Sequence, residues 1–171
     1  VQLLPGQGET VGAQLTGDDR VRGVMFTGST EVATLLQRNI ASRLDAQGRP
    51  IPLIAETGGM NAMIVDSSAL TEQVVIDVLA SAFDSAGQRC SALRVLCLQD
   101  EIADHTLKML RGAMAECRMG NPGRLTTDIG PVIDSEAKAN IERHIQTMRS
   151  KGRPVFQAVR ELSLIHISEP T

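Results

Sequence analysis

An α/β fold with a parallel sheet is the fold class that the sequence predicts. Short apolar runs of strand length alternate with longer stretches in which apolar residues recur at helical spacing. Breaks that contain glycine or proline separate many of these stretches. Hydrophobic residues make up 42% of the 171 positions, which is enough to bury a core. The alternation is typical of βαβ units, in which a helix connects two parallel strands.

The first half of the chain is expected to contain two strands and one helix. The run 21–26 (VRGVMF) indicates a buried strand that ends at a Thr-Gly-Ser break. A helix is expected over 29–44, because Ser29 can cap its start and its apolar residues share one face. A second strand is expected at 51–56, with Pro52 near its start.

The second half continues the alternation with two strands and three helices. Strands are expected at 61–66 and 92–98, and helices at 70–86, 101–117 and 135–151. Asn-Pro-Gly and Gly-Pro mark a long loop before the last helix.

Composition and charge argue against several classes of protein. The formal net charge is −3 with both signs mixed, so neither a nucleic-acid nor a membrane-surface partner is expected. No apolar run approaches the roughly 18 residues of a membrane span, and no secretory signal is seen. The three cysteines, an odd number without metal spacing, are expected to be reduced in the cytoplasm. His105 and His144 lie on charged helix faces and are expected to be solvated.

The chain is expected to be a piece of a longer protein. It starts at Val1 rather than at a methionine, and it has no Trp, no Tyr and only three Phe. Aromatic side chains usually supply much of a core, so this composition is sparse for a self-sufficient domain. The pair Gly58-Gly59 is the interior point at which the chain could pass between two domains.

A candidate phosphate site lies in the motif FTGST, residues 26–30. A strand is expected to end at Phe26 and a helix to start at Ser29, which would direct free backbone N–H groups and the positive helix end at one place. Gly28 would let the backbone approach a ligand closely, and Ser29 could donate its hydroxyl. An ordinary strand-to-helix turn with a serine cap has the same pattern, and spacing alone favours that interpretation.

Glu56 ends an apolar strand just before two glycines. Sites in open α/β sheets form at the carboxyl ends of strands, so Glu56 is a candidate general base. A strand-end carboxylate that points into solvent is an equally good interpretation of the residues alone.

Cys90 follows a helix and the turn SAGQR, and it is a candidate nucleophile. Arg89 beside it could favour the thiolate. A lone cysteine is more often a small buried apolar residue, and the residues alone favour that alternative. Cys97 inside a strand and Cys117 at a helix end are expected to be core residues.

Three motifs in one order, FTGST, ETGG and GQRC, resemble the NAD(P)-dependent aldehyde dehydrogenase superfamily. Cys90 lies 34 positions after Glu56, which matches the usual spacing of that superfamily. The resemblance extends over residues 1–161 and is greatest for the branch that oxidises L-glutamate γ-semialdehyde in bacterial proline catabolism. One departure is Ala33, where many relatives have glycine, and a helix is expected to tolerate it.

The resemblance implies a role for each candidate residue. Cys90 would be the nucleophile, and Glu56 would be the base that activates the deacylating water. Gly28 and Ser29 would lie under the NAD pyrophosphate, and Ser91 would lie near the substrate carboxylate. The implied reaction is NAD-dependent oxidation of L-glutamate γ-semialdehyde to L-glutamate through a cysteine thiohemiacetal and thioester.

The resemblance also implies how the chain is organised. It would be an internal fragment of the aldehyde dehydrogenase fold, with 1–57 ending a Rossmann-like NAD-binding domain and 58–161 starting the α/β catalytic domain. The parent is expected to be a multifunctional, cytoplasmic, homo-oligomeric enzyme that takes NAD and a small aldehyde, and the fragment alone is expected to be inactive. Residues 162–171 (LSLIHISEPT) break the pattern and are expected to be translated sequencing adapter.

Other functions remain open. The parent could oxidise another small acidic aldehyde such as succinate semialdehyde, or the chain could be a non-catalytic relative that kept only the fold. Retention of both Glu56 and Cys90 argues against a non-catalytic relative. A redox sensor would need a resolving thiol near Cys90, and Cys97 inside a strand is not expected to supply one.

Overall fold

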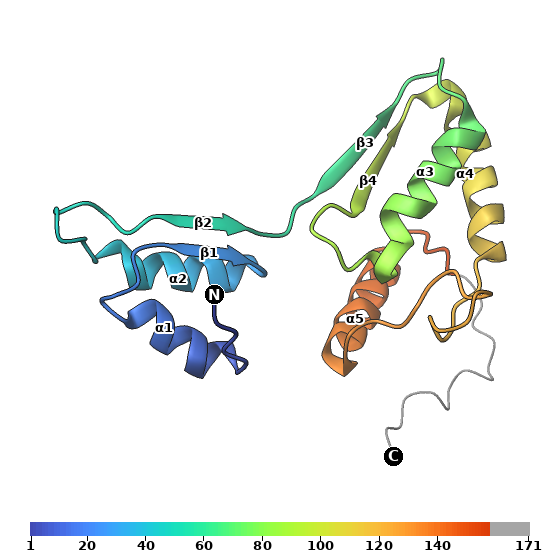
Figure 1. The fold of residues 1–171 in the computed structure, drawn as a ribbon. Helices are drawn as coiled ribbons and strands as arrows, with labels where there is room; N and C mark the ends of the chain where they lie inside the picture. The colour runs from blue at the N-terminus through green and yellow to red at the C-terminus, as the bar shows by residue number, and fades with distance from the viewer. Residues whose placement is uncertain (158–171) are drawn as a thin grey trace. The chain divides into compact units, whose positions relative to one another are not determined.

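The computed structural model describes residues 1–157 and divides into two compact units (Figure 1). The first unit is Val1–Gly59, and the second begins at Met60. Each unit contains helices and a two-stranded parallel sheet. The predicted α/β class and the predicted parallel pairing are therefore confirmed. The segment 162–171 lies outside the described residues.

The first unit contains η1 (Gly8–Gly12), α1 (Ala13–Gly17), β1 (Val24–Thr27), α2 (Thr30–Ala41) and β2 (Leu53–Glu56). β1 and β2 pair in parallel, and the pairing ends with Thr27 opposite Glu56. α2 connects the two strands and buries Ala33 and Ile40. The helix runs without a break through Ala33, so alanine is accommodated at this position.

The helical segment formed by η1 and α1 lies where the apolar pattern predicts no element. Gly8, Gly12 and Gly17 belong to it, and glycine costs about 1 kcal/mol relative to alanine in a helix interior. The segment is too short to show a helical period of apolar residues in the sequence. Because its helix propensity is weak, packing within the unit has to stabilise it.

The second unit contains β3 (Asn61–Val65), α3 (Thr71–Phe83), η2 (Asp84–Gly87), β4 (Leu93–Leu98), α4 (Asp100–Glu116) and α5 (Ser135–Ser150). β3 and β4 pair in parallel, with an irregularity between Asn61 and Ala62. α3 packs against α4 and β4 (Figure 1). Val75 and Val78 of α3 and Thr106 of α4 are buried.

Every strand and helix predicted from residue 21 onward is present, with ends that move by at most three residues. Two burial predictions are wrong. The strand predicted as buried at 21–26 exposes Met25 to 82%, and Cys97 on β4 is exposed rather than in a core. Successive strand side chains point to opposite faces, so in these narrow two-stranded sheets alternate residues remain open to solvent.

Candidate active site

Glu56 and Gly28 lie together at the carboxyl edge of the first sheet. Thr27 is the last residue of β1 and pairs with Glu56, the last residue of β2. The N–H of Gly28 then donates to the carbonyl of Glu56 at 3.0 Å. The glycine turn and the glutamate are 28 positions apart in sequence, and parallel pairing brings them to one edge.

Ser29 occupies the N-cap position of α2. Its hydroxyl oxygen accepts a hydrogen bond from the N–H of Val32 at 3.2 Å, which satisfies one free donor of the first helical turn. Gly28, Ser29 and Thr30 are exposed. The N–H groups of Gly28 and Val32 are already bonded, so Ser29 and Thr30 are exposed residues whose N–H groups can meet a ligand from solvent.

Gly28 has a close neighbour on one side. The ring of Phe26 lies where a Cβ at position 28 would be, so a larger residue would have to displace the ring. The glycine therefore allows the Phe26 ring to fold against the start of α2.

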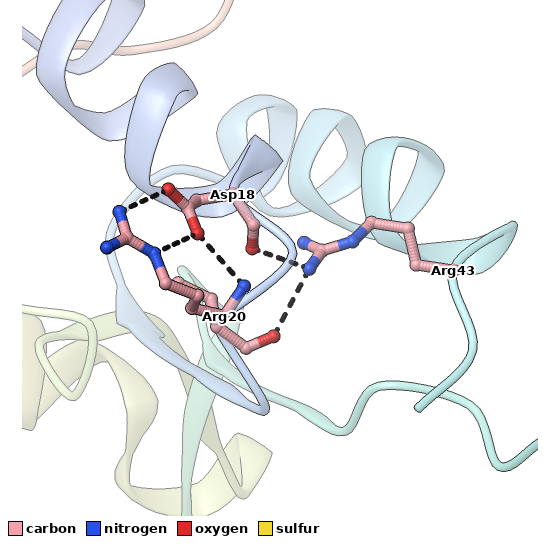
Figure 2. Close-up of polar contacts among 4 residues, drawn as sticks. Asp18, Arg20 and Arg43 are labelled. Atoms are coloured by element: carbon pink, nitrogen blue, oxygen red, sulfur yellow. Dashed lines mark hydrogen bonds and ion pairs between the residues drawn. The ribbon is translucent and has the colours of Figure 1, made fainter. Parts of the chain in front are cut away.

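A network of polar contacts holds the segment that leads into β1 (Figure 2). The guanidinium of Arg43, just after α2, donates to the carbonyls of Thr16, Asp18 and Val21, the last two at 2.7 and 3.2 Å. Arg20 binds both carboxylate oxygens of Asp18 at 2.9 and 2.8 Å. The hydrogen bonds from Arg20 hold the pKa of Asp18 well below its ordinary value. These contacts tie the end of α2 to the chain that precedes β1.

The segment 85–92, called the Cys90 loop below, includes the last three residues of η2, leads into β4 and has an unusual backbone. Ser85 and Ala86 have φ angles of 54°, and Gly87 follows with a φ of 69°. A Cβ at Gly87 would lie 2.7 Å from the carbonyl oxygen of Ala82, so only glycine fits there. The chain then reaches Cys90, which is exposed in the turn before β4.

Side chains from several elements bind the Cys90 loop. Asn61 at the start of β3 donates to the carbonyls of Cys90 and Ala92, at 2.7 and 3.0 Å. Arg94 on β4 donates to the carbonyls of Gly87 and Arg89, at 2.9 and 3.2 Å.

Gln88 belongs to the loop itself and connects it to a more distant segment. Its side-chain oxygen accepts from the N–H of Ile133 at 2.7 Å, and its nitrogen donates to the Ser85 carbonyl at 2.9 Å. Sequence reasoning misses Asn61, Arg94 and Gln88 as supporting residues. Their only signal is position, because Gln88 lies inside the GQRC motif and Asn61 and Arg94 lie within four residues of the ETGG and GQRC motifs.

The remaining candidates are placed as follows. Ser91 directly follows Cys90 and is exposed. Cys90 and Ser91 belong to the second unit, whereas Gly28, Ser29 and Glu56 belong to the first. His105 and His144 are exposed, as expected, and His166 lies outside the described residues.

Over residues 1–157, no group of three or more His, Cys, Asp or Glu side chains could hold a metal ion. None of the helices in this range is both long and apolar enough to cross a membrane.

Comparison with known proteins identifies similar sequences and structures. The sequence model described as "Aldehyde dehydrogenase family" matches residues 1–165. The bifunctional protein PutA of Escherichia coli (strain K12) is 98% identical over 163 residues, which cover 95% of this chain and 12% of that protein. A 1-pyrroline-5-carboxylate dehydrogenase of Bacillus cereus (strain B4264) is 33% identical over 153 residues, which cover 90% of this chain and 30% of that protein.

A solved structure also resembles this chain. The betaine aldehyde dehydrogenase of Staphylococcus aureus in complex with NAD⁺ superposes with a TM-score of 0.79 at 29% identity, covering 86% of this chain and 28% of the other. The match to the Escherichia coli protein described above covers about an eighth of the length of that protein.

Proposed function

This chain belongs to the aldehyde dehydrogenase family, and we propose that, within a longer enzyme, it takes part in the NAD-dependent oxidation of L-glutamate γ-semialdehyde to L-glutamate. The observation that carries the proposal is the 98% identity to the Escherichia coli protein over 163 residues, a stretch long enough to include both Glu56 and Cys90. The name of the Bacillus relative supports the same substrate class, since 1-pyrroline-5-carboxylate is the cyclic form of this semialdehyde.

Cys90 is the proposed nucleophile. Its exposed thiolate attacks the aldehyde carbon, a C–S bond forms, and the carbonyl electron pair moves onto oxygen. The resulting oxyanion needs a hydrogen-bond donor that is already in place, and the backbone N–H of Cys90 is the proposed donor from this chain.

Glu56 is the proposed general base of the second half-reaction. When bound, NAD would accept the hydride that leaves the carbon bonded to Cys90, and the loss of this hydride would leave a thioester. Glu56 then removes a proton from water, the hydroxide attacks the thioester carbon, and the C–S bond breaks to release the acid and restore the thiolate. Its position at the end of β2 is a favourable one, because the carboxylate projects from a strand edge rather than from a core.

The residues at the start of α2 fit the diphosphate of NAD. The first residues of α2 are exposed, and within residues 1–157 the Ser29 hydroxyl acts only as an acceptor, so its proton is available to a ligand. Gly28 and Ser29 are therefore the proposed NAD-binding residues of this chain. NAD rather than NADP is the proposed cofactor.

Ser91 is the proposed contact for the substrate carboxylate. It is exposed and adjoins the nucleophile, and a serine hydroxyl can donate a hydrogen bond to a carboxylate. In the same proposal, 1–57 end the NAD-binding domain, 58–161 begin the catalytic domain, and the parent enzyme is a cytoplasmic homo-oligomer.

The test uses an enzyme called the graft below, in which residues 1–161 of this chain replace the matching segment of the Escherichia coli protein. Production of NADH is measured with L-glutamate γ-semialdehyde and, separately, with succinate semialdehyde. The proposal expects a kcat/KM at least tenfold higher for the first aldehyde and no activity in Cys90→Ala. A preference for succinate semialdehyde, or activity that survives Cys90→Ala, would overturn it.

A further inference from the structure

Two side chains bind the peptide units on either side of Cys90. The Arg94 guanidinium binds the carbonyl of Arg89 at 3.2 Å, and the Asn61 amide binds the carbonyl of Cys90 at 2.7 Å. Each also binds a second carbonyl of the Cys90 loop, that of Gly87 for Arg94 and that of Ala92 for Asn61. Both peptide groups that flank the thiol-bearing residue are therefore held by donors from the parallel β3–β4 pair.

These contacts set the direction of the Cys90 N–H. A peptide group is planar and trans, so its N–H points opposite to its C=O. Arg94 fixes the carbonyl of the Arg89–Cys90 peptide, and the N–H at the other end of that peptide belongs to Cys90. Within residues 1–157 this N–H donates to no acceptor. It is therefore an oriented donor that is free for an incoming group.

The backbone before Cys90 explains why such contacts are needed. Ser85 and Ala86 have a left-handed conformation that residues other than glycine seldom adopt. A strained segment of this kind persists only where surrounding contacts hold it. Arg94 and Asn61 bind the residues that directly follow this segment, and they do so from strands β4 and β3, which are more rigid than a loop.

We propose that Asn61 and Arg94 are positioning residues that hold the Cys90 loop so that the Cys90 N–H points at the oxyanion formed on the carbon that Cys90 attacks. This inference rests on the proposed role of Cys90 as a nucleophile. Neither residue touches the substrate in this proposal, and both act through the two peptide groups beside Cys90.

The test compares two reactions of Cys90 in the graft. Acylation by p-nitrophenyl acetate passes through an oxyanion, whereas alkylation by iodoacetamide displaces iodide and forms none. Arg94→Met and Asn61→Asp remove the donors with little change in size, and Arg94→Lys keeps a positive donor. Arg111→Met is the matched control, because Arg111 is exposed on α4 and makes no hydrogen bond or ion pair with the Cys90 loop within residues 1–157.

Arg94→Met and Asn61→Asp are expected to slow acylation by about 10- to 100-fold, the loss typical of a misplaced reacting group. Alkylation is expected to change by less than about twofold, and Arg94→Lys is expected to recover part of the acylation rate. Arg111→Met is expected to match the unmodified graft in both reactions.

Three results would overturn the inference. Equal losses in acylation and alkylation would show that the residues only maintain the fold of the loop, and unchanged acylation would show that they are not needed. Failure of Arg94→Lys to exceed Arg94→Met would also contradict it. Neither probe requires NAD or the semialdehyde, so a graft that reacts with both probes but does not oxidise the aldehyde contradicts the proposed function alone.

Discussion

At the residue scale, the three cysteines differ in their surroundings. Cys90 and Cys97 are exposed, whereas Cys117 is half-buried and its thiol donates to the carbonyl of Ala113 at 3.4 Å. Burial raises the pKa of Cys117, and the nearby negative charge of Asp128 raises it further. The thiolate of Cys117 is therefore disfavoured at neutral pH, since a raised thiol pKa favours the protonated form.

Iodoacetamide labelling of the graft is expected to modify Cys90 first, because Cys90 is the proposed nucleophile and lies in an exposed turn, whereas Cys97 lies within strand β4 and Cys117 is half-buried. Cys117 is expected to react slowly at pH 7 and to approach the rate of an exposed thiol only as the pH rises through its raised pKa. Peptide mass spectrometry over a pH series measures both rates. Preferential labelling of Cys97 or Cys117 with activity retained would contradict the assignment of Cys90.

Glu56→Gln in the graft is expected to separate the two half-reactions. Thioester formation does not need this base, so a burst of NADH should remain, whereas the following hydrolysis should slow by about 10²- to 10⁴-fold. Rapid-mixing absorbance at the NADH band records the burst and the later slow phase. Unchanged steady-state turnover would show that Glu56 does not act as the base, and Glu72→Gln on the surface of α3 is the control.

At the element scale, the Cys90 loop depends on a glycine that no helix or strand pattern predicts. Gly87 has a φ of 69° and a neighbouring carbonyl oxygen 2.7 Å from where a Cβ would be. Gly112 offers a matched comparison, because it lies inside α4 and an added Cβ there meets nothing within 4 Å.

Gly87→Ala in the graft is expected to destabilise the Cys90 loop by roughly 1–3 kcal/mol, the cost of a left-handed backbone with an added clash. Gly112→Ala is expected to stabilise α4 by up to about 1 kcal/mol through helix propensity. Hydrogen exchange of peptides that span 84–92 and 100–116 measures each local effect. Slower exchange over 84–92 in Gly87→Ala would contradict the strain argument.

At the scale of the whole molecule, the described chain exposes many large apolar side chains. Met25, Ile54 and Ile64 lie on the strands and are 82%, 55% and 85% exposed. Each sheet has two strands, so backbone groups at the strand edges lack partners that further strands would supply. A large apolar side chain left in water forfeits roughly 1.5–3 kcal/mol, against a typical domain stability of about 5–15 kcal/mol.

The 171-residue chain by itself is therefore expected to unfold without a cooperative transition and to lack aldehyde-dependent NADH production. Circular dichroism during heating and an NADH assay check this, with the chain prepared both with and without residues 162–171. A cooperative transition together with activity in either form would contradict the expectation. Folding of the shorter form alone would support a non-native tail and contradict the argument from truncation.

The order of strands and α-helices from residue 21 onward, the parallel pairing and the candidates at Glu56 and Cys90 follow from the sequence, because hydrophobic period and short motifs depend on neighbouring residues. The tertiary structure alone decides that Asn61 binds the carbonyl of Cys90, 29 positions away, since this contact depends on how β3 aligns with β4. It likewise decides the contact of Arg43 with the chain before β1, 25 positions from Asp18. The exposure of Cys97 also cannot be predicted from the local sequence pattern. A strand residue is buried only when another layer covers its face of the sheet, and the number of layers is decided by the assembled fold.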